Sequence, residues 1–267
     1  MRRRDFIVQS GIAAAALATP GALQARGKQS RQFIELRIYH FASPDKQHSF
    51  AHFVETAAIP AFNRAGARPV GVFKLQMSDN PDLKLTADST DLYVLLPHHS
   101  ADSLATFLSQ LGGDQVFQQA GKEIITAPKS DPAFQRYESS LMLAFEDFPQ
   151  VKVPTSATTR LLQLRIYESH SNERARKKIE MFNQGGELAI FARSGMTGVF
   201  FGQTLIGSKL PNLTYMLAFP TEQDQKKAWD TFRNDSEWKR LSAAAEYKDT
   251  VSNVTNLILR PAAGSQI

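Results

Sequence analysis

The strongest constraint on the fold is a short segment that occurs twice in the chain. Residues 35–39 read Glu-Leu-Arg-Ile-Tyr, and residues 163–167 read Gln-Leu-Arg-Ile-Tyr. Four further pairs of segments follow in the same order: Gly-Val-Phe at 71–73 and 198–200, Tyr-Val-Leu-Leu at 93–96 and Tyr-Met-Leu-Ala at 215–218, Asp-x-x-Phe at 114–117 and Asp-x-x-Trp at 235–238, and Leu-Met-Leu at 141–143 and Leu-Ile-Leu at 257–259. Because the order is kept, the chain is an internal duplication, and we expect one module built twice.

Each copy predicts the same series of secondary-structure elements. In the first copy we expect a strand at 33–41, a helix from the Ser43 cap to about Arg64 with a kink at Pro60, strands at 70–77 and 91–96, helices over about 100–120 and a closing strand at 139–145. The second copy repeats this pattern over 161–260. Strand, helix, strand, strand, helix, strand is the ferredoxin-like arrangement. The modules therefore span 33–146 and 161–260, and a linker with prolines, serines and threonines joins them at 147–160.

A four-stranded sheet with helices on one side leaves its other face bare, and such a face tends to be an interface. Two modules in one chain can press these faces together and close the sheets into a barrel, which also shields the strand edges. We therefore predict an α+β fold of two ferredoxin-like modules packed sheet to sheet. The fused pair would replace a dimer, so a monomer or a weak homodimer is expected.

The first 25 residues have the features of an export signal. Three arginines at 2–4 precede Asp-Phe-Ile and an Ala-rich apolar run, and a Pro-Gly pair and a small residue follow. This order resembles a twin-arginine signal and predicts a periplasmic or secreted protein. A Sec signal and an uncleaved anchor are the alternatives. The run is short for a membrane span, and no other segment approaches about 20 apolar residues, so no stable span is expected after removal of the signal.

Composition excludes several classes of function. The 267 residues include no cysteine, which excludes disulfides, thiolate metal sites and cysteine nucleophiles. The net charge of +5 falls to +3 without residues 1–25, which contain three arginines and one aspartate. The densest basic run, 174–178, lies on a predicted helix where Glu173 can pair with Lys177 and Glu180 with Arg176. We therefore predict no nucleic-acid partner.

The repeated segments resemble the NIPSNAP family. The resemblance rests on the Glu-Leu-Arg-Ile-Tyr strand, the Arg-x-Gly end of the first helix, the Gly-Val-Phe and Tyr-Val-Leu-Leu strands and the Asp-x-x-Trp segment, and it covers about 33–146 and 161–260. The first copy departs from the pattern by carrying Phe117 where the second has Trp238. The resemblance implies the dimeric α/β-barrel superfamily and a tandem of NIPSNAP domains. It implies no established enzymatic reaction, so catalytic residues stay unknown.

The first strand of each module supplies the main candidate ligand-binding residues. Alternation separates an apolar set (Ile34, Leu36 and Ile38; Leu162, Leu164 and Ile166) from a polar set (Glu35, Arg37 and Tyr39; Gln163, Arg165 and Tyr167). We expect the apolar set under the helices and the polar set between the two sheets. Two arginines and two tyrosines there could hold a small anionic or aromatic ligand. The alternative is internal pairing, of Arg37 with Glu35 and of Arg165 with Gln163 or backbone carbonyls.

The histidines give weaker signals. His98 and His99 follow a strand at a loop, where functional residues often occur, and they are added to the candidate ligand-binding set. His48, His52 and Glu55 share one edge of a helix, but this edge lies opposite its apolar face, so no metal site is predicted. His40 ends the first strand on the side of Ile38, and His170 is expected in a solvated turn. No cofactor is predicted.

Three functions stay open at this point. The first is an exported binding or interaction protein with an Arg/Tyr-lined site. The second is an enzyme of the same superfamily, such as a cofactor-independent monooxygenase, an isomerase or a haem-degrading protein, which requires a pocket between sheet and helices with a histidine or an acid aimed into it. His40, His98 and His99 are the candidates for that role. The third is a structural module with a filled interior. No Gly-x-Ser-x-Gly elbow, phosphate loop or dinucleotide fingerprint is present, which argues against the common hydrolases and nucleotide enzymes.

Overall fold

The computed structural model describes residues 29–267, so the predicted signal at 1–25 lies outside the described residues. The first module consists of β1 (Phe33–His40), α1 (Pro44–Phe53), the π-helical turn η1 (Val54–Ala58), α2 (Ile59–Arg64), β2 (Gly71–Leu75), the 3-10 turn η2 (Pro81–Leu83), β3 (Leu92–His98), α3 (Ala101–Gly113), α4 (Gln115–Ala120), α5 (Lys122–Ile125) and β4 (Arg136–Ala144). The second consists of β5 (Leu161–Glu168), α6 (Asn172–Phe182), α7 (Glu187–Arg193), β6 (Thr197–Ile206), β7 (Asn212–Phe219), α8 (Glu222–Asn234), α9 (Ser236–Ala243), the 3-10 turn η3 (Ala245–Tyr247) and β8 (Asn253–Pro261).

The first helix of each module begins at a matching serine cap. The Ser43 and Ser171 hydroxyls accept hydrogen bonds from the amides three residues on, which satisfies one otherwise free donor at each helix start. In the first module α1, η1 and α2 run on without a break, and the π-helical turn ends just before Pro60. Proline lacks the amide proton of a regular helix, so the irregular turn lies where the sequence predicts a kink.

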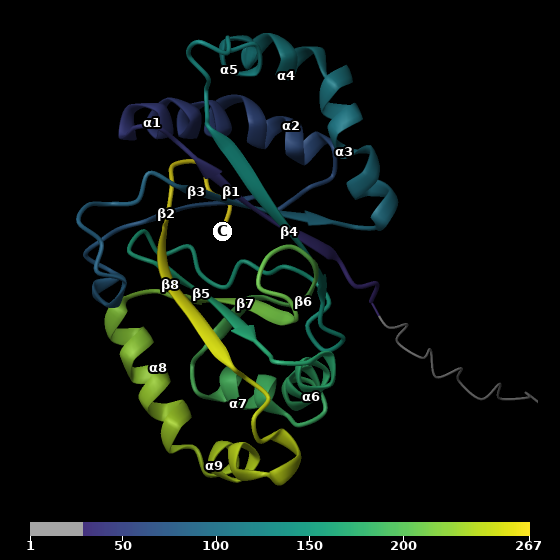
Figure 1. Cartoon of the computed structure of the whole chain (residues 1–267), viewed down its shortest axis with the longest axis vertical. Coiled ribbons are helices and arrows are strands. Elements are labelled where there is room, and N and C mark those ends of the chain that lie inside the picture. The colour runs from purple at the N-terminus through teal and green to yellow at the C-terminus, as the bar shows by residue number, and fades with distance from the viewer. Residues whose placement is uncertain (1–28) are drawn as a thin grey trace, which may run out of the picture.

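All eight strands close into one antiparallel barrel in the order β1-β3-β2-β8-β5-β7-β6-β4 (Figure 1). Each module contributes four strands, and the modules join at two seams, where β4 pairs with β6 and β2 pairs with β8. The helices of one module cover the barrel at one end of the view and those of the other module cover the opposite end. The prediction of two ferredoxin-like modules packed sheet to sheet is therefore confirmed.

The predicted orientation of the first strands is wrong. The apolar residues Ile34, Leu36, Leu162 and Leu164 lie inside the barrel, where side chains of both modules form one core. The polar set faces the helices instead, in the layer occupied by two separate outer cores. The physical reason is that the closed barrel interior is occupied by packed apolar side chains of both modules. A charged guanidinium is accommodated only where it finds a carboxylate, aromatic rings or a path to water.

The segments after β4 and β8 also reach the barrel. Val151, within the 147–160 segment, and Ile267 at the end of the chain are both buried in the inner core. The backbone amide of Lys152 donates to the Val199 carbonyl at 2.9 Å, and that of Gln266 donates to the Val70 carbonyl at 2.9 Å. Each segment therefore packs against both modules.

The short β2–β8 seam is extended by side chains of the turn at 78–82. β2 pairs with β8 over only three residues. Beyond them, the Asn80 carboxamide donates to the Ile258 carbonyl at 2.8 Å and accepts from the Ile258 amide at 2.8 Å, as another strand residue would. Arg260 adds a two-bond ion pair to Asp79, with both distances at 2.7 Å. This turn therefore acts as a clamp between the modules.

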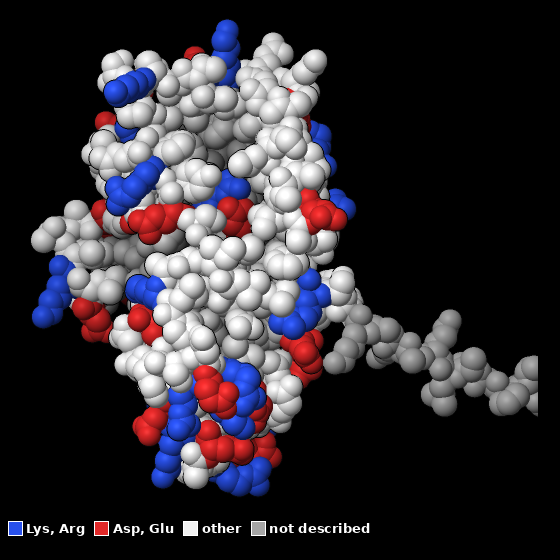
Figure 2. Space-filling model, turned by 45° about the vertical axis from the view of Figure 1, so that its right-hand side comes forward, with Lys and Arg blue, Asp and Glu red and all other residues white. Residues whose placement is uncertain are grey.

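On the face shown in Figure 2, basic and acidic side chains are interspersed, most densely at the end of the molecule formed by the second module. On α6 the predicted pair of Glu180 with Arg176 is present at 3.2 Å. Glu173, however, pairs with Arg176 rather than with Lys177, and Lys177 pairs with Glu180 at 2.8 Å. No helix within residues 29–267 is long and apolar enough to cross a membrane.

Candidate functional site

Each module has a pocket between its sheet and its helices, and the two pockets use matching positions. The first pocket, of about 180 Å³, is lined by Arg37, Tyr39, Phe50, Phe53, Val54, Ala58, Phe62, Val94, Leu111, Phe117, Ile124, Ile125 and Phe134. The second pocket, of about 540 Å³, is lined by Gln163, Arg165, Tyr167, Lys178, Glu187, Phe191, Trp229, Phe232, Arg233, Trp238, Val251 and Val254. The duplication therefore provides two versions of one site, and their differences indicate which residues the fold itself does not require.

In the first pocket the charge of the arginine is neutralised by a carboxylate on the same strand. Arg37 donates from Nε and Nη2 to the two carboxylate oxygens of Glu35, at 2.7 and 2.9 Å. Ser139 donates to the same carboxylate at 2.8 Å, and the His98 ring nitrogen lies 3.3 Å from it. The internal pairing considered for Arg37 is thus present. Since the remaining lining is almost wholly apolar, this pocket offers little to an ionic ligand.

The same contacts make Glu35 a strong acid. Burial by itself would raise the pKa of the Glu35 carboxyl, but hydrogen bonds from His98, Arg37 and Ser139 outweigh it and lower the pKa to about 2. The ordinary value for this group is 4.5. The carboxylate is therefore retained in moderately acidic solution, together with the contacts that it holds in place.

This pKa predicts an acid-sensitive stability. A carboxyl with a lowered folded-state pKa stabilises the fold fully above its unfolded value, and the stabilisation is lost as the pH falls from about 4.5 towards 2, with a total of about 3 kcal/mol. Urea unfolding of the wild type and of Glu35→Gln between pH 5 and 2.5 checks this. The wild type should lose stability over this range with a steeper slope than the variant. Equal slopes would contradict the assignment to Glu35.

In the second pocket the arginine has no such partner. The position of Glu35 is taken by Gln163, whose carboxamide is engaged elsewhere: Nε2 donates to Asn256 at 2.7 Å, and Oε1 accepts from Trp229 Nε1 at 2.7 Å. The alternative pairing of Arg165 with Gln163 is therefore not formed. Arg165 makes no hydrogen bond or ion pair within residues 29–267, and its buried Nε is unsatisfied. Its guanidinium lies 4.7 Å from the Trp229 ring centre and 5.3 Å from that of Tyr167.

A buried ion pair lies in the wall of the second pocket. Lys178 Nζ on α6 is 2.8 Å from a carboxylate oxygen of Glu187 on α7, and both residues are almost fully buried. Burial raises the pKa of the Glu187 carboxyl, against the opposing effect of the Lys178 and Arg165 charges. Desolvation dominates because this carboxylate has few other polar neighbours.

The repeat shows that this pair is not needed to build the module. Lys178 lies seven residues after the Ser171 cap, and the residue seven after the Ser43 cap is Phe50. Glu187 lies eight residues before Gly195, and the residue eight before Gly66 is Ala58; both glycines end their helices with a positive φ. The first module thus holds the same fold with a phenylalanine and an alanine.

Two of the repeated sequence patterns meet to position Trp238. Arg193, in the Arg-x-Gly helix end, donates two hydrogen bonds to Asp235 at 2.8 and 2.7 Å. Asp235 in turn caps α9 by accepting from the Trp238 amide at 2.9 Å. The first module has the equivalent contacts of Arg64 with Asp114, which place Phe117. These patterns therefore hold an aromatic side chain at the pocket of each module.

The structure separates the candidate residues into two groups. Gln163, Arg165 and Tyr167 line the second pocket, and Arg37 and Tyr39 line the first, with Glu35 and His98 behind them. The two arginines do not share one site between the sheets, which corrects the expectation of a joint arginine-lined seam. His99 is exposed and lines neither pocket, and His40 is held by Asp91 at 2.8 Å. Among residues 29–267 no group of histidine and acidic side chains is placed to hold a metal ion.

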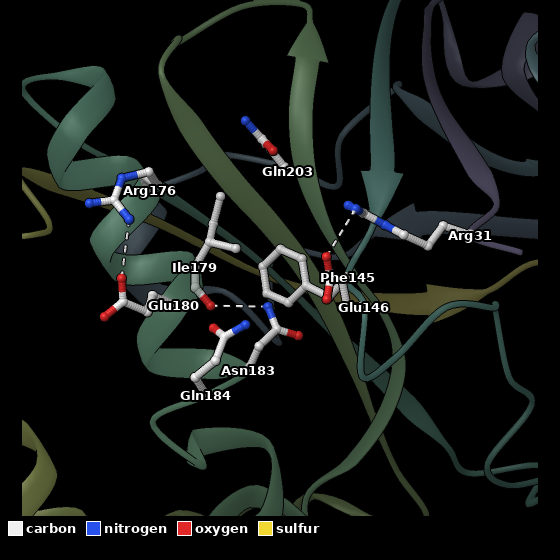
Figure 3. Close-up of a pocket in the computed structure, with 9 residues that line it drawn as sticks. All are labelled: Arg31, Phe145, Glu146, Arg176, Ile179, Glu180, Asn183, Gln184 and Gln203. Atoms are coloured by element: carbon white, nitrogen blue, oxygen red, sulfur yellow. Dashed lines mark hydrogen bonds and ion pairs between the residues drawn. The ribbon is translucent and has the colours of Figure 1, made fainter. Parts of the chain in front are cut away.

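A third cleft, of about 450 Å³, lies outside both modules' sheet–helix layers, between α6 and the edge formed by Phe145 and β6 (Figure 3). Its charged groups are occupied by one another: Arg176 binds Glu180 at 3.2 Å, and Arg31 lies 4.0 Å from Glu146. Asn183 donates to the Ile179 carbonyl at 3.1 Å. The second pocket is the better candidate site because it contains a charge without a protein partner.

Comparison with known families decides the identity of the second module. Residues 162–266 match the NIPSNAP family model. The chain carries a NIPSNAP domain. This domain contains the whole second pocket, and the first module, with the same fold, lies outside the matched range. No curated protein matches the chain.

Two solved structures share the fold over most of this chain. A candidate monooxygenase from Fusobacterium nucleatum has a TM-score of 0.57 at 10% identity, over 87% of this chain and 93% of its own. A candidate monooxygenase from Lactobacillus acidophilus has a TM-score of 0.55 at 10% identity, over 87% and 94%. An uncharacterised NIPSNAP-like domain protein from Burkholderia xenovorans is 20% identical over 39% of this chain and 86% of its own, with a TM-score of 0.36. At these identities the likeness concerns the fold alone.

Proposed function

We propose that this protein binds a small aromatic anion in the pocket of its NIPSNAP domain, and that it does so after export through the signal at residues 1–25. The observation that carries the proposal is Arg165. Its guanidinium has neither a hydrogen bond nor an ion pair among residues 29–267, whereas its counterpart Arg37 is fully paired with Glu35. Arg165 is half-buried, but its Nε atom is enclosed without a hydrogen-bond partner, which is costly, so a bound anion would complete the site.

The charges around the pocket favour an anion. Arg165, Lys178 and Arg233 contribute three positive charges, and Glu187 contributes one negative charge. Glu187 is already paired with Lys178, and Arg233 with Asp230 on the same helix, so the excess positive charge lies on Arg165. An arginine presents a planar fork of donors that matches a carboxylate, so a carboxylate or an enolate-like oxygen is the group we expect there.

The rest of the lining favours an aromatic body on this anion. Both tryptophans of the protein, Trp229 and Trp238, line the pocket, together with Tyr167, Phe191 and Phe232. Flat ring faces bind a planar apolar ligand by offset or edge contacts, which gives affinity without a hydrogen bond. A site of about 540 Å³ is in the usual size range for a small organic ligand.

Calorimetric titration with 3-phenylpropionate and its neutral amide tests this assignment. The carboxylate should bind more tightly than the amide, and Arg165→Met should weaken its binding about 10–100-fold, because a charge-assisted hydrogen bond contributes about 1.5–3 kcal/mol. Lys226→Met is the matched control, since it removes one positive charge from the exposed surface of α8.

The outcomes separate the possibilities. Unchanged binding in the Lys226→Met control, together with weaker binding in Arg165→Met, supports the site. Equal affinity for acid and amide, or full affinity in Arg165→Met, would refute it. Native mass spectrometry of protein purified from its own compartment adds the identity of any molecule that it retains.

A further inference from the structure

The Lys178–Glu187 pair is a feature that neither the fold nor simple binding of an anion explains. A carboxylate beside an anion site opposes the ligand by repulsion, and the first module shows that Phe50 and Ala58 can fill the same positions. Buried ion pairs are also rarely more stable than apolar side chains of similar volume. The pair therefore has a cost in both stability and affinity, which a chemical role would account for.

The pair is placed where such a role is possible. Glu187 and Lys178 both line the second pocket with Arg165 and the two tryptophans. Lys178 also lies 5.7 Å from the ring centres of Tyr167 and Trp238, so its ammonium is enclosed by the aromatic walls. Arg165 lies close enough to Glu187 for its charge to act on that carboxyl. A ligand held at Arg165 therefore lies next to an acid whose proton affinity is increased by burial.

We propose that Glu187 transfers a proton to and from a carbon of the bound ligand, so that the NIPSNAP domain interconverts keto and enol forms of an aromatic 2-oxo acid. This inference rests on the proposed binding function. Arg165 would hold the carboxylate and the adjacent oxygen, Glu187 would be the proton acceptor and donor, and Lys178 would orient Glu187 and offset the charge that moves.

The step balances without any further reactant. The carbon–hydrogen bond next to the carbonyl breaks, and its proton forms an O–H bond on the Glu187 carboxylate. The electron pair of the broken carbon–hydrogen bond forms a carbon–carbon double bond, and the π pair of the carbonyl group moves onto its oxygen, which gives an enolate whose negative charge faces Arg165. The neutral Glu187 carboxyl then returns the proton to the oxygen or to the carbon, so nothing is oxidised or reduced. A carboxyl with an increased pKa suits both halves of this transfer at neutral pH.

The chemical class follows from the lining. The carboxylate is required by the unpaired arginine, and the aromatic ring by the tryptophan walls. The acidic C–H bond next to a carbonyl is required by the single carboxyl base, which is too weak to remove a proton from an unactivated carbon. Phenylpyruvate combines all three features and is the probe that we choose.

Proton exchange into phenylpyruvate tests the role of Glu187. In D₂O, the wild type should accelerate the loss of the C3 proton signal in the NMR spectrum, and Glu187→Gln should reduce this acceleration about 100-fold or more, as expected for a general base. Glu187→Asp should restore part of it. Lys178→Phe with Glu187→Ala, which copies the first module, should abolish it, and Lys226→Met should leave it unchanged.

Binding is measured in parallel with 3-phenylpropionate, which lacks the carbonyl group and cannot react. Glu187→Gln should bind this acid as well as the wild type does, or more tightly, because a negative charge is removed. Normal binding with no exchange by the wild type, or with full exchange by Glu187→Gln, would overturn the catalytic inference and leave the binding proposal intact. Absence of binding of either acid to the wild type would overturn both.

Discussion

Replacing Lys178 alone with methionine is expected to lower the free energy of unfolding by about 3–5 kcal/mol at neutral pH. The Glu187 carboxyl would remain buried without its 2.8 Å partner. Because burial already raises the pKa of this carboxyl, removal of Lys178 would raise it further. A carboxyl with a raised folded-state pKa loses stability as the pH rises from about 4.5 through the folded-state value. The variant should therefore be close to the wild type in acid and weakest at neutral pH.

The double variant Lys178→Phe with Glu187→Ala is the matched comparison. It copies Phe50 and Ala58 of the first module and leaves no unpaired charge, so we expect it to be as stable as the wild type or more stable, by up to about 4 kcal/mol. Chemical denaturation at pH 5 and pH 7.5 measures both variants. If the double variant is as unstable as the single one, the pair is a structural requirement and the comparison of the modules is misleading.

Removing the side chain of Asn80 should have the second large effect on stability. Asn80→Ala leaves the amide and the carbonyl of Ile258 without their partner at the end of the three-residue β2–β8 pairing. Each unsatisfied buried group costs about 1–3 kcal/mol, so we expect a loss of about 2–4 kcal/mol. Asp82→Ala, at an exposed position two residues on, is the control and should change stability little.

Hydrogen exchange would locate that effect. The amides of β2 and β8 should lose protection in Asn80→Ala, and those of the β4–β6 seam should keep it, because that seam has its own longer pairing. Uniform loss of protection over the whole barrel would contradict a local clamp.

The duplicated module and its strand order could be predicted from sequence because these depend on periodicity and caps. The repeated strand with Arg37 and Arg165, and the serine cap at 43, define the same elements in sequence and in structure. The sequence could not predict which set of side chains on those strands points into the barrel and which points towards the helices. β3 is buried along its whole length, so its pattern does not distinguish the barrel side from the helix side. On β1 alternation separates the polar from the apolar residues but does not show which set lies between the two sheets. The structure places the apolar set there.

The candidate site was predicted only in part for a related reason. Arg165 and Tyr167 are visible in the strand pattern, but Lys178 and Glu187 lie on helices among many other charged residues. Nothing in the helix sequence 172–182 distinguishes Lys178 from its solvated neighbours. A signal does exist in the comparison of the repeats, where a lysine takes the place of a buried phenylalanine and a glutamate that of an alanine. Three-dimensional packing is needed to show that these two exchanges meet at 2.8 Å.

The covalent joining of the halves has a consequence for how such a protein can change. In a barrel made from two identical subunits, every substitution appears in both pockets. A side chain that gives one pocket a function must therefore also be accommodated in the other. Here β4 and β5 belong to one polypeptide, and an exchange in one half leaves the other untouched. One module can keep an apolar pocket that stabilises the barrel. The other can carry ionic groups that, in a symmetric dimer, would destabilise both subunits.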